Sequence, residues 1–350
     1  MRKKTTCMLL LAVFLVATAA VAAEQPVVVL IATGGTIAMK IDPVKKAPVP
    51  AISGEDLLAT VPEVAKYARM EVNNISNIPS GYMGPANWVA LTKAANQTLA
   101  RKEVAGIIVS HGTDTLEETA YWLDLTSTSD KPIVLIGAQR NASEADFDGP
   151  RNLLNAVRIC VDPQSKGKGA MLVMNNQINA ARDVAKTHTS SVETFKSGDW
   201  GFLGAVDFDR VFYARAPLRR QHVPLATDTM PYVEIIPTYG GTDGYLIKAA
   251  LDHGAKGLVI QALGWGNVNP ATSAEIKAAI KQGIPVVIST RVPNGRVLPN
   301  YGYEGGGKVL YDAGAVMADD LTPQKARILL MLLLQNGVQG QQNLQAAFSR

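Results

Sequence analysis

The sequence is poor in cysteine: its 350 residues contain only Cys7 and Cys160. Cys7 lies in an N-terminal segment that we expect to be removed on export, which leaves one thiol in the mature chain. An exported protein with a single cysteine cannot form an internal disulfide, so its hydrophobic core has to supply its stability. Cys160 stands in a segment of helical spacing, where we expect a buried, small apolar side chain.

Histidine is nearly as scarce, and the common motifs of metal and nucleotide sites are missing. The four histidines form no H-E-x-x-H pattern and there is no cysteine cluster, so metal activation has no basis in the sequence. The G-x-S-x-G segment typical of Ser-His-Asp hydrolases is also absent. No Walker A motif occurs, and T-G-G-T-I-A at residues 33–38 lacks the G-x-G-x-x-G spacing of dinucleotide sites.

A large excess of charge of one sign is lacking too. The chain has 34 basic and 30 acidic residues, but residues 1–23 contain three of the basic ones and no acidic one. Without that segment, 31 basic residues stand against 30 acidic ones, so charge gives no reason to expect a nucleic-acid or membrane partner. The hydrophobic content of 47% and the charged content of 18% are those of an ordinary globular protein.

The first 23 residues have the pattern of an export signal. Three basic residues among the first four precede the apolar run Met8–Ala17, and small residues follow before Glu24. Because the run is too short to cross a bilayer comfortably, we predict a signal peptide over residues 1–23 that is removed. The mature protein would then be periplasmic or secreted, with no membrane partner. An uncleaved anchor is the alternative.

Short apolar runs rich in valine and isoleucine alternate with longer segments of helical spacing. This alternation predicts parallel sheets covered by helices, and the unbroken apolar character of the runs fits strands buried on both faces. The expected strands are 27–32, 104–110, 132–137, 170–174, 233–237, 257–261 and 285–289, and the expected helices are 85–101, 116–125, 151–160, 243–253 and 271–282.

A proline-containing stretch without periodicity, near residues 216–231, divides the chain. We predict an α/β fold with a larger N-terminal domain, residues 24–218, whose mainly parallel sheet is flanked by helices. A linker, residues 219–231, leads to a smaller C-terminal α/β domain, residues 232–350. Residues 39–50 hold three prolines and three lysines without an apolar period, and we expect there a mobile loop, either a lid or a plain surface excursion.

Two of the expected strands each run into a turn built around threonine. The first turn is Thr33-Gly34-Gly35-Thr36, and the second is His111-Gly112-Thr113-Asp114-Thr115. The carboxyl ends of parallel strands face the ligand crevice of an open α/β sheet, so the two turns suggest a site with a hydroxyl nucleophile. The glycines let the backbone approach a ligand closely, and their N–H groups suit an oxyanion.

A threonine hydroxyl needs a base to take its proton before it attacks. A desolvated lysine can serve, because burial lowers the lysine pKa until the amine is partly neutral. Lys186, which follows the expected strand 170–174, is the candidate. A single lysine taken alone is far more often a solvated surface group.

Four segments, in order, give the chain a resemblance to the asparaginase/glutaminase family, and in particular to its bacterial type II L-asparaginases. They are T-G-G-T-I-A at 33–38, H-G-T-D-T-L-E-E-T-A at 111–120, R-D-V-x-K-T at 182–187 and P-Q-K-A-R at 323–327. The second segment is highly specific, and the similarity spans essentially all of the mature chain. The resemblance implies hydrolysis of the side-chain amide of L-asparagine to the acid and ammonia. It implies no cofactor and no metal.

The resemblance also implies roles for individual residues. Thr36 would attack the amide carbon and form an acyl intermediate that water then releases, while Thr113, Asp114 and a buried Lys186 form the supporting catalytic group. The implied substrate-binding residues are Gly35, Ser80, Gly81, Thr113, Asp114 and Glu304. These residue types suit the zwitterionic substrate, because hydroxyl and backbone N–H donors bind an α-carboxylate and a carboxylate binds an α-ammonium.

A homotetramer built from dimers is a further implication, with Glu304 of a neighbouring small domain completing the ammonium site. The chain departs from the family pattern around the substrate. Gly81 stands where a Gln or Glu is common, Trp265 replaces an Asn, and the expected lid has no tyrosine, for which Tyr301 or Tyr303 is the candidate substitute. These departures bear on substrate preference more than on the type of reaction.

Three alternative functions stay open at this point. The first is a glutaminase-leaning member of the family. The second is the asparaginase-like subunit of a tRNA-dependent amidotransferase, against which the export signal and the near-neutral charge argue. The third is a non-catalytic periplasmic amino-acid binding protein, which would bind asparagine without consuming it.

Overall fold

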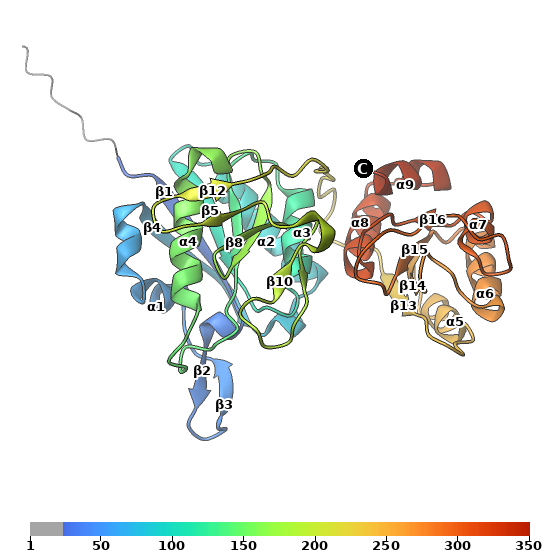
Figure 1. Ribbon diagram of the computed structural model, residues 1–350, viewed down its shortest axis with the longest axis horizontal. Coiled ribbons are helices and arrows are strands. Elements are labelled where there is room, and N and C mark those ends of the chain that lie inside the picture. The colour runs from blue at the N-terminus through green and yellow to red at the C-terminus, as the bar shows by residue number, and fades with distance from the viewer. Residues whose placement is uncertain (1–23) are drawn as a thin grey trace, which may run out of the picture.

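The computed structural model describes residues 24–350, so the expected export signal lies outside the described residues. The chain forms a larger N-terminal and a smaller C-terminal α/β domain, which lie side by side (Figure 1). The larger domain is built on an eight-stranded sheet and the smaller on a four-stranded sheet. This architecture confirms the predicted fold class. No helix within residues 24–350 has the length and apolar composition that crossing a membrane requires.

The larger sheet has the strand order β12-β11-β8-β7-β6-β5-β1-β4. Five strands are parallel: β1 (Val27–Gly34), β4 (Arg69–Ile78), β5 (Val104–Ser110), β6 (Ile133–Ile136) and β7 (Ala170–Met174). All of them except β4 were predicted from the sequence. Three more extend the sheet in antiparallel fashion: β8 (Gln177–Ala180), β11 (Gly204–Val206) and β12 (Val211–Tyr213). All eight residues of β1 are buried, which explains its unbroken apolar sequence.

Helices cover both faces of this sheet. Along β1, side chains alternate between two hydrophobic clusters, since Val29 belongs to one and Leu30 to the other. The first cluster includes residues of α2 (Pro85–Leu99) and α3 (Leu116–Thr126), and the second includes residues of α1 (Gly54–Ala59) and α4 (Gly149–Val161). Cys160 of α4 is buried, as expected, with its Sγ 3.5 Å from the carbonyl oxygen of Ile107. Burial also raises the pKa of its thiol.

The smaller sheet is entirely parallel, with the order β13-β14-β15-β16. Its strands are β13 (Val233–Pro237), β14 (Gly257–Ala262), β15 (Val286–Thr290) and β16 (Val316–Met317), and its helices are α5 (Tyr245–Asp252), α6 (Pro270–Lys281), α7 (Gly307–Asp312), α8 (Pro323–Gln335) and α9 (Gln341–Phe348). Helix α8 packs on this sheet and also on α3 of the larger domain (Figure 1). One hydrophobic cluster therefore continues from the larger domain into the smaller one.

The connection between the domains contains no helix or strand from residue 214 to residue 232. The expected linker 219–231 falls inside it, and the domain boundaries at 218 and 232 stay predictions. Short 3₁₀ turns punctuate the rest of the larger domain: η1 (Thr36–Ala38), η2 (Pro62–Lys66), η3 (Ser80–Tyr82), η4 (Pro163–Ser165) and η5 (Gly198–Trp200).

The sequence predicts a mobile loop at residues 39–50; the structure instead shows regular secondary structure there, and the mobility and the lid role stay predictions. The segment is a β-hairpin of β2 (Met39–Asp42) and β3 (Ala47–Pro50), which projects from the larger domain (Figure 1). Its turn is closed by Asp42, whose Oδ1 accepts hydrogen bonds from the N–H groups of Val44 and Lys45. Most of the hairpin is exposed, so no apolar alternation marks it in the sequence.

Candidate functional site

The two threonine turns meet at the carboxyl ends of β1 and β5, which are neighbouring parallel strands. Gly35 has φ 85° and ψ −175°, a backbone conformation that is essentially restricted to glycine. A Cβ on Gly35 would lie 2.1 Å from the Cα of Gly112, so a side chain at this position would push the turns apart. A Cβ on Gly112 would in turn lie 2.6 Å from the Oγ of Ser80. Glycine thus lets three backbone segments converge here.

The two threonines of the first turn differ in their surroundings. Thr33 is buried, and its hydroxyl donates to the carbonyl oxygen of Ser110 at 2.8 Å, which links the ends of β1 and β5. Thr36 begins η1 and is only partly buried. Within residues 24–350, no hydrogen-bond partner is found for the Thr36 hydroxyl. Of the two, Thr36 is the hydroxyl that is available to a ligand.

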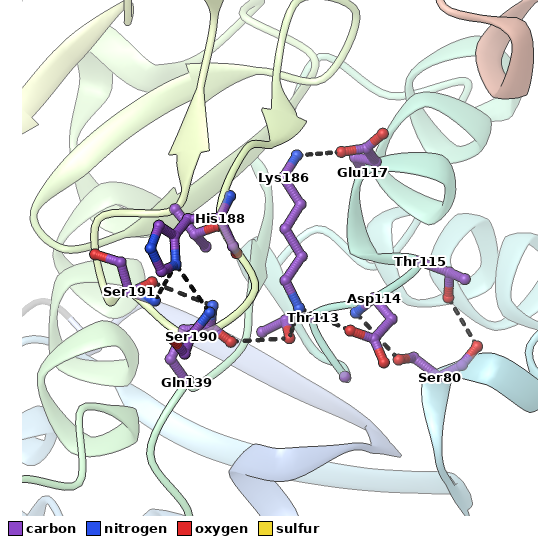
Figure 2. Close-up of polar contacts among 12 residues, drawn as sticks. Ser80, Thr113, Asp114, Thr115, Glu117, Gln139, Lys186, His188, Ser190 and Ser191 are labelled. Atoms are coloured by element: carbon purple, nitrogen blue, oxygen red, sulfur yellow. Dashed lines mark hydrogen bonds and ion pairs between the residues drawn. The ribbon is translucent and has the colours of Figure 1, made fainter.

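Lys186 joins the second turn from a different part of the chain (Figure 2). It ends β9 (Ala185–Lys186), which pairs with β10 (Phe195–Lys196) in a small antiparallel sheet. Its Nζ donates to Thr113 Oγ1 at 2.9 Å and to Asp114 Oδ1 at 2.7 Å. The Lys186 side chain is 16% exposed, whereas that of Asp114 is 74% exposed. The structure thus brings together three of the expected catalytic side chains.

Gln139, which we did not predict, completes the contacts of Thr113 (Figure 2). The Thr113 hydroxyl donates to Gln139 Oε1 at 3.2 Å while it accepts from Lys186. The Gln139 amide is held in turn, because its Nε2 donates to the carbonyl oxygen of Ser191 at 3.1 Å. Gln139 follows β6, the strand beside β5, so the rule that singled out the two threonine turns would also have found it.

Ser80 lies against the second turn from η3. It is 5% exposed, and its Oγ accepts from the N–H of Asp114 at 3.3 Å, while its carbonyl oxygen accepts from the Thr115 hydroxyl at 2.8 Å. Gly81, the next residue, is exposed, and a Cβ there would meet no atom within 4 Å. The Ser80 hydroxyl is therefore fixed beside the turn, and the space next to Gly81 is open.

His111 supports the second turn from behind. It is fully buried, with Nδ1 2.7 Å from the carbonyl oxygen of Gly112 and Nε2 2.9 Å from the Thr119 hydroxyl. The carbonyl oxygen of Gly112 can only accept, so Nδ1 carries the proton of the neutral ring and Nε2 accepts from the Thr119 hydroxyl, whose oxygen also accepts from the indole N–H of Trp88. Burial lowers the pKa of His111 to about 4, so the ring is neutral near pH 7.

Glu304 is not brought to this cluster within one chain. It lies in the smaller domain, where its carboxylate accepts from Ser273 Oγ at 2.6 Å and from Lys277 Nζ at 2.7 Å, both on α6. These two donors hold the pKa of Glu304 below its ordinary value. Trp265 and Tyr301 lie in the same domain with their ring centroids 5.9 Å apart, and both are partly exposed. Both candidate substitutes for a lid tyrosine, Tyr301 and Tyr303, thus lie in the smaller domain, with their ring centroids 5.5 Å apart.

Comparisons with known proteins agree with this fold. The family description "Asparaginase, N-terminal" matches residues 27–219, and "Glutaminase/Asparaginase C-terminal domain" matches residues 232–348. The chain is 39% identical over 334 residues to the L-asparaginase 2 of Bacillus subtilis (strain 168), which covers 93% of this chain and 86% of that protein. It is 38% identical to a probable periplasmic L-asparaginase of Haemophilus influenzae, which covers 88% of each.

A solved structure leads to the same group of proteins. The crystal structure of a probable cytoplasmic L-asparaginase from Campylobacter jejuni superposes with a TM-score of 0.85 at 34% identity, covering 93% of this chain and all of that one. Fold and sequence thus define a two-domain α/β amidohydrolase. The chain belongs to the asparaginase/glutaminase family.

Proposed function

We propose that this enzyme hydrolyses the side-chain amide of L-asparagine to L-aspartate and ammonia through an acyl-enzyme on Thr36. The observation that carries the proposal is the contact of the Lys186 amine with Thr113 Oγ1 and Asp114 Oδ1, beside the turn that ends in Thr36. An amine that touches a threonine hydroxyl at 2.9 Å is placed to exchange a proton with it.

The proposed reaction has two steps. Thr36 Oγ attacks the amide carbon, the C–N bond breaks, and nitrogen leaves as ammonia with the proton that the hydroxyl gave up. Water then attacks the ester, which releases aspartate and restores the hydroxyl. Lys186 with Thr113 carries the proton. The N–H groups of the two threonine turns are the candidate donors for the developing oxyanion, except that of Gly35, which already donates to the carbonyl oxygen of Ile78 at 3.0 Å.

The same residues account for substrate binding. We propose that the Ser80 hydroxyl and the Gly81 N–H receive the α-carboxylate, because hydroxyl and N–H groups are donors suited to an anion. Gly35, whose N–H donates to the carbonyl oxygen of Ile78, contributes by letting the backbone come close to the ligand. Asp114 has one carboxylate oxygen on Lys186 and a largely exposed side chain, which suits it to the α-ammonium of an arriving substrate.

Substitution of Thr36 tests the nucleophile. We expect Thr36→Val, which keeps the shape and loses the hydroxyl, to fold and to lose nearly all ammonia release from asparagine. Thr36→Ser keeps a hydroxyl and should retain part of it. Ammonia release by the purified wild-type chain separates an enzyme from a binding protein, and undiminished turnover by the valine variant would rule out Thr36 as the nucleophile.

Glutamine is the second candidate substrate. The open space at Gly81 favours it, because a substrate with one more methylene needs room that a longer side chain would take. Parallel assays with asparagine, glutamine and their D-isomers decide the preference, and equal values of kcat/KM for the two L-amides would make the enzyme a glutaminase-asparaginase.

We also propose that the active form is a homotetramer built from dimers, in which Glu304 serves the site of a neighbouring chain. Supporting this, Asp114 is 74% exposed in one chain, and the polar contacts of Glu304 stay within its own domain. Mixing the separately inactive variants Thr36→Val and Glu304→Ala is the test. If Glu304 acts on a neighbour, mixed oligomers contain an intact site and regain activity, whereas action within one chain restores nothing.

The cellular location belongs to the same proposal. The pattern of residues 1–23 supports export, as a type II, periplasmic member of the family would require. Mass determination of the protein from a cell that expresses the full chain should find a mature form beginning at Glu24. An intact N-terminus in the cytoplasm would contradict export and leave the reaction unaffected.

A further inference from the structure

Lys325 is a lysine of the smaller domain whose amine is buried against the larger domain. It lies in the first turn of α8 and is 1% exposed. Its Nζ donates to the carbonyl oxygen of Arg182 at 2.9 Å and also to that of Val184. Both acceptors are backbone atoms of the larger domain, so the ammonium ties α8 to one short segment there.

That segment leads directly to the catalytic lysine proposed above. Val184 precedes β9, and Lys186 is two residues farther along. From the other side, the N–H of Lys186 donates to the carboxylate of Glu117 on α3. The backbone of Lys186 is thus fixed between a contact from α3 and two upstream contacts from α8, and a shift of Val184 would displace the amine relative to Thr113.

Domain attachment alone does not require a lysine at this position. Helix α8 already packs on α3 of the larger domain, and a buried ammonium costs free energy unless its donors find acceptors. Burial lowers the pKa of Lys325 to about 8, and the carboxylates around it, Glu117, Asp183 and Asp320, oppose that shift while Arg182 adds to it. Charged or neutral, the amine has at least two N–H donors for its two carbonyl acceptors.

We propose that Lys325 is a positioning residue, which holds the backbone before Lys186 so that the Lys186 amine meets Thr113 and Asp114. The inference rests on the proposed function of Lys186. It makes the placement of a group in the larger domain depend on a side chain of the smaller one. Arg182 and Asp320 form a separate ion pair between the domains at 2.8 Å, so attachment of the domains does not depend on Lys325 alone.

The test compares two substitutions at Lys325 in the full mature protein. Lys325→Met removes the donors and keeps the length, and Lys325→Gln keeps an N–H₂ group on a shorter side chain. We expect kcat for asparagine to fall at least tenfold in the methionine variant and less in the glutamine variant, since displacement of a catalytic group by about 1 Å costs up to about a hundredfold. KM should change less than kcat. The proton transfer depends directly on the Lys186 amine, whereas Ser80 and the backbone of Asp114 lie on segments that Lys325 does not touch.

Lys131 provides a matched control. Its Nζ also donates to two carbonyl oxygens, those of Leu99 at 2.9 Å and Arg101 at 2.5 Å. It precedes β6, however, and so lies at the opposite end of the strands from the threonine turns. Lys131→Met should leave kcat within twofold of wild type. Amide exchange in residues 184–187 should quicken in Lys325→Met and stay unchanged in Lys131→Met.

The outcomes separate the inference from the proposed function. A wild-type chain that releases no ammonia from asparagine overturns the function itself. An active wild type together with a Lys325→Met variant whose kcat is within twofold overturns only the positioning proposal, as does an equal loss in Lys131→Met. If the methionine variant does not fold, the glutamine variant is measured in its place. A fall in its kcat with a smaller change in KM supports the positioning proposal, and a kcat within twofold of wild type overturns it.

Discussion

The amine of Lys186 lies 2.9 Å from Oγ1 of Thr113, and this contact joins two segments that are 73 residues apart in the sequence. A lysine in a partly buried sheet and a threonine at the end of β5 form a pair that neither segment forms by itself. The proposed chemistry depends on this pair.

Lys186→Met should abolish most of the activity while the protein stays folded. Removal of a group that moves protons typically lowers kcat by about 10²–10⁴-fold, and methionine keeps much of the side-chain volume. Steady-state ammonia release from asparagine measures the loss, and thermal unfolding checks the fold.

The control for this substitution is Lys196→Met. Lys196 lies on β10, pairs across the sheet with Ala185 and has a side chain that is 39% exposed. Lys196 is also a lysine of this two-stranded sheet, but it does not contact Thr113. The kcat of Lys196→Met should therefore stay within twofold of the wild-type value. Retained activity in Lys186→Met would exclude the lysine from proton transfer, and equal losses in both variants would indicate damage to the sheet.

Gly35→Ala should be far more damaging than the same change at Gly167. Both glycines have positive φ, 85° and 77°, but a Cβ at Gly35 meets the backbone of Gly112 at 2.1 Å, whereas nothing lies within 4 Å at Gly167. We expect a loss of about 3 kcal/mol or more in the free energy of unfolding at Gly35 and about 1–2 kcal/mol at Gly167. Urea unfolding of the two variants gives the comparison, and similar losses would contradict the close approach of the turns.

Burial decided which strands the sequence could predict. Every residue of β1 is buried, so its apolar run is visible without knowledge of its neighbours. Strand β4 lies at the edge of the sheet and holds polar residues such as Asn73 and Asn74, so it has no such run. The hairpin 39–50 was missed for the same reason, because pairing between backbones holds it and hydrophobic burial does not.

The candidate site also has a part that the sequence predicts and a part that it does not. The two threonine turns could be predicted because strand ends and glycines mark them locally, and Lys186 was named from its sequence context. The contacts of Glu117 with the backbone of Lys186 and of Lys325 with Val184 span 69 and 141 residues. Such contacts depend on how helices α3 and α8 pack, and no local spacing in the sequence encodes that packing.

Gly81→Gln should alter substrate binding without harming the fold. A side chain at Gly81 meets no atom within 4 Å and would project beside Ser80. One added hydrogen bond to the substrate contributes about 1 kcal/mol, so KM for asparagine should fall about fivefold, while KM for the longer glutamine should fall less or rise. Gly84→Gln, also in open space three residues later, is the control and should leave both KM values unchanged. Identical effects at the two positions would mean that Gly81 does not face the substrate.

His111 should make the protein lose stability as pH falls. Its pKa is lowered by burial from 6.5 to about 4, so between these values the unfolded chain binds a proton that the folded chain does not. This contribution to the free energy of unfolding is fully present above pH 6.5 and is lost as pH falls through about 4, with a total on the order of 3 kcal/mol.

Urea unfolding of wild type and His111→Gln at several pH values isolates this contribution, because the other titrating groups cancel in the difference. The variant should be the less stable at pH 7, since the contacts with Thr119 and Gly112 are disturbed, and the difference should shrink towards pH 4. His222→Gln, at an exposed histidine, is the control variant and is compared with His111→Gln at each pH. A difference for His111→Gln that stays constant with pH would show that the folded ring takes up its proton as readily as the unfolded one, and that its burial does not keep it neutral.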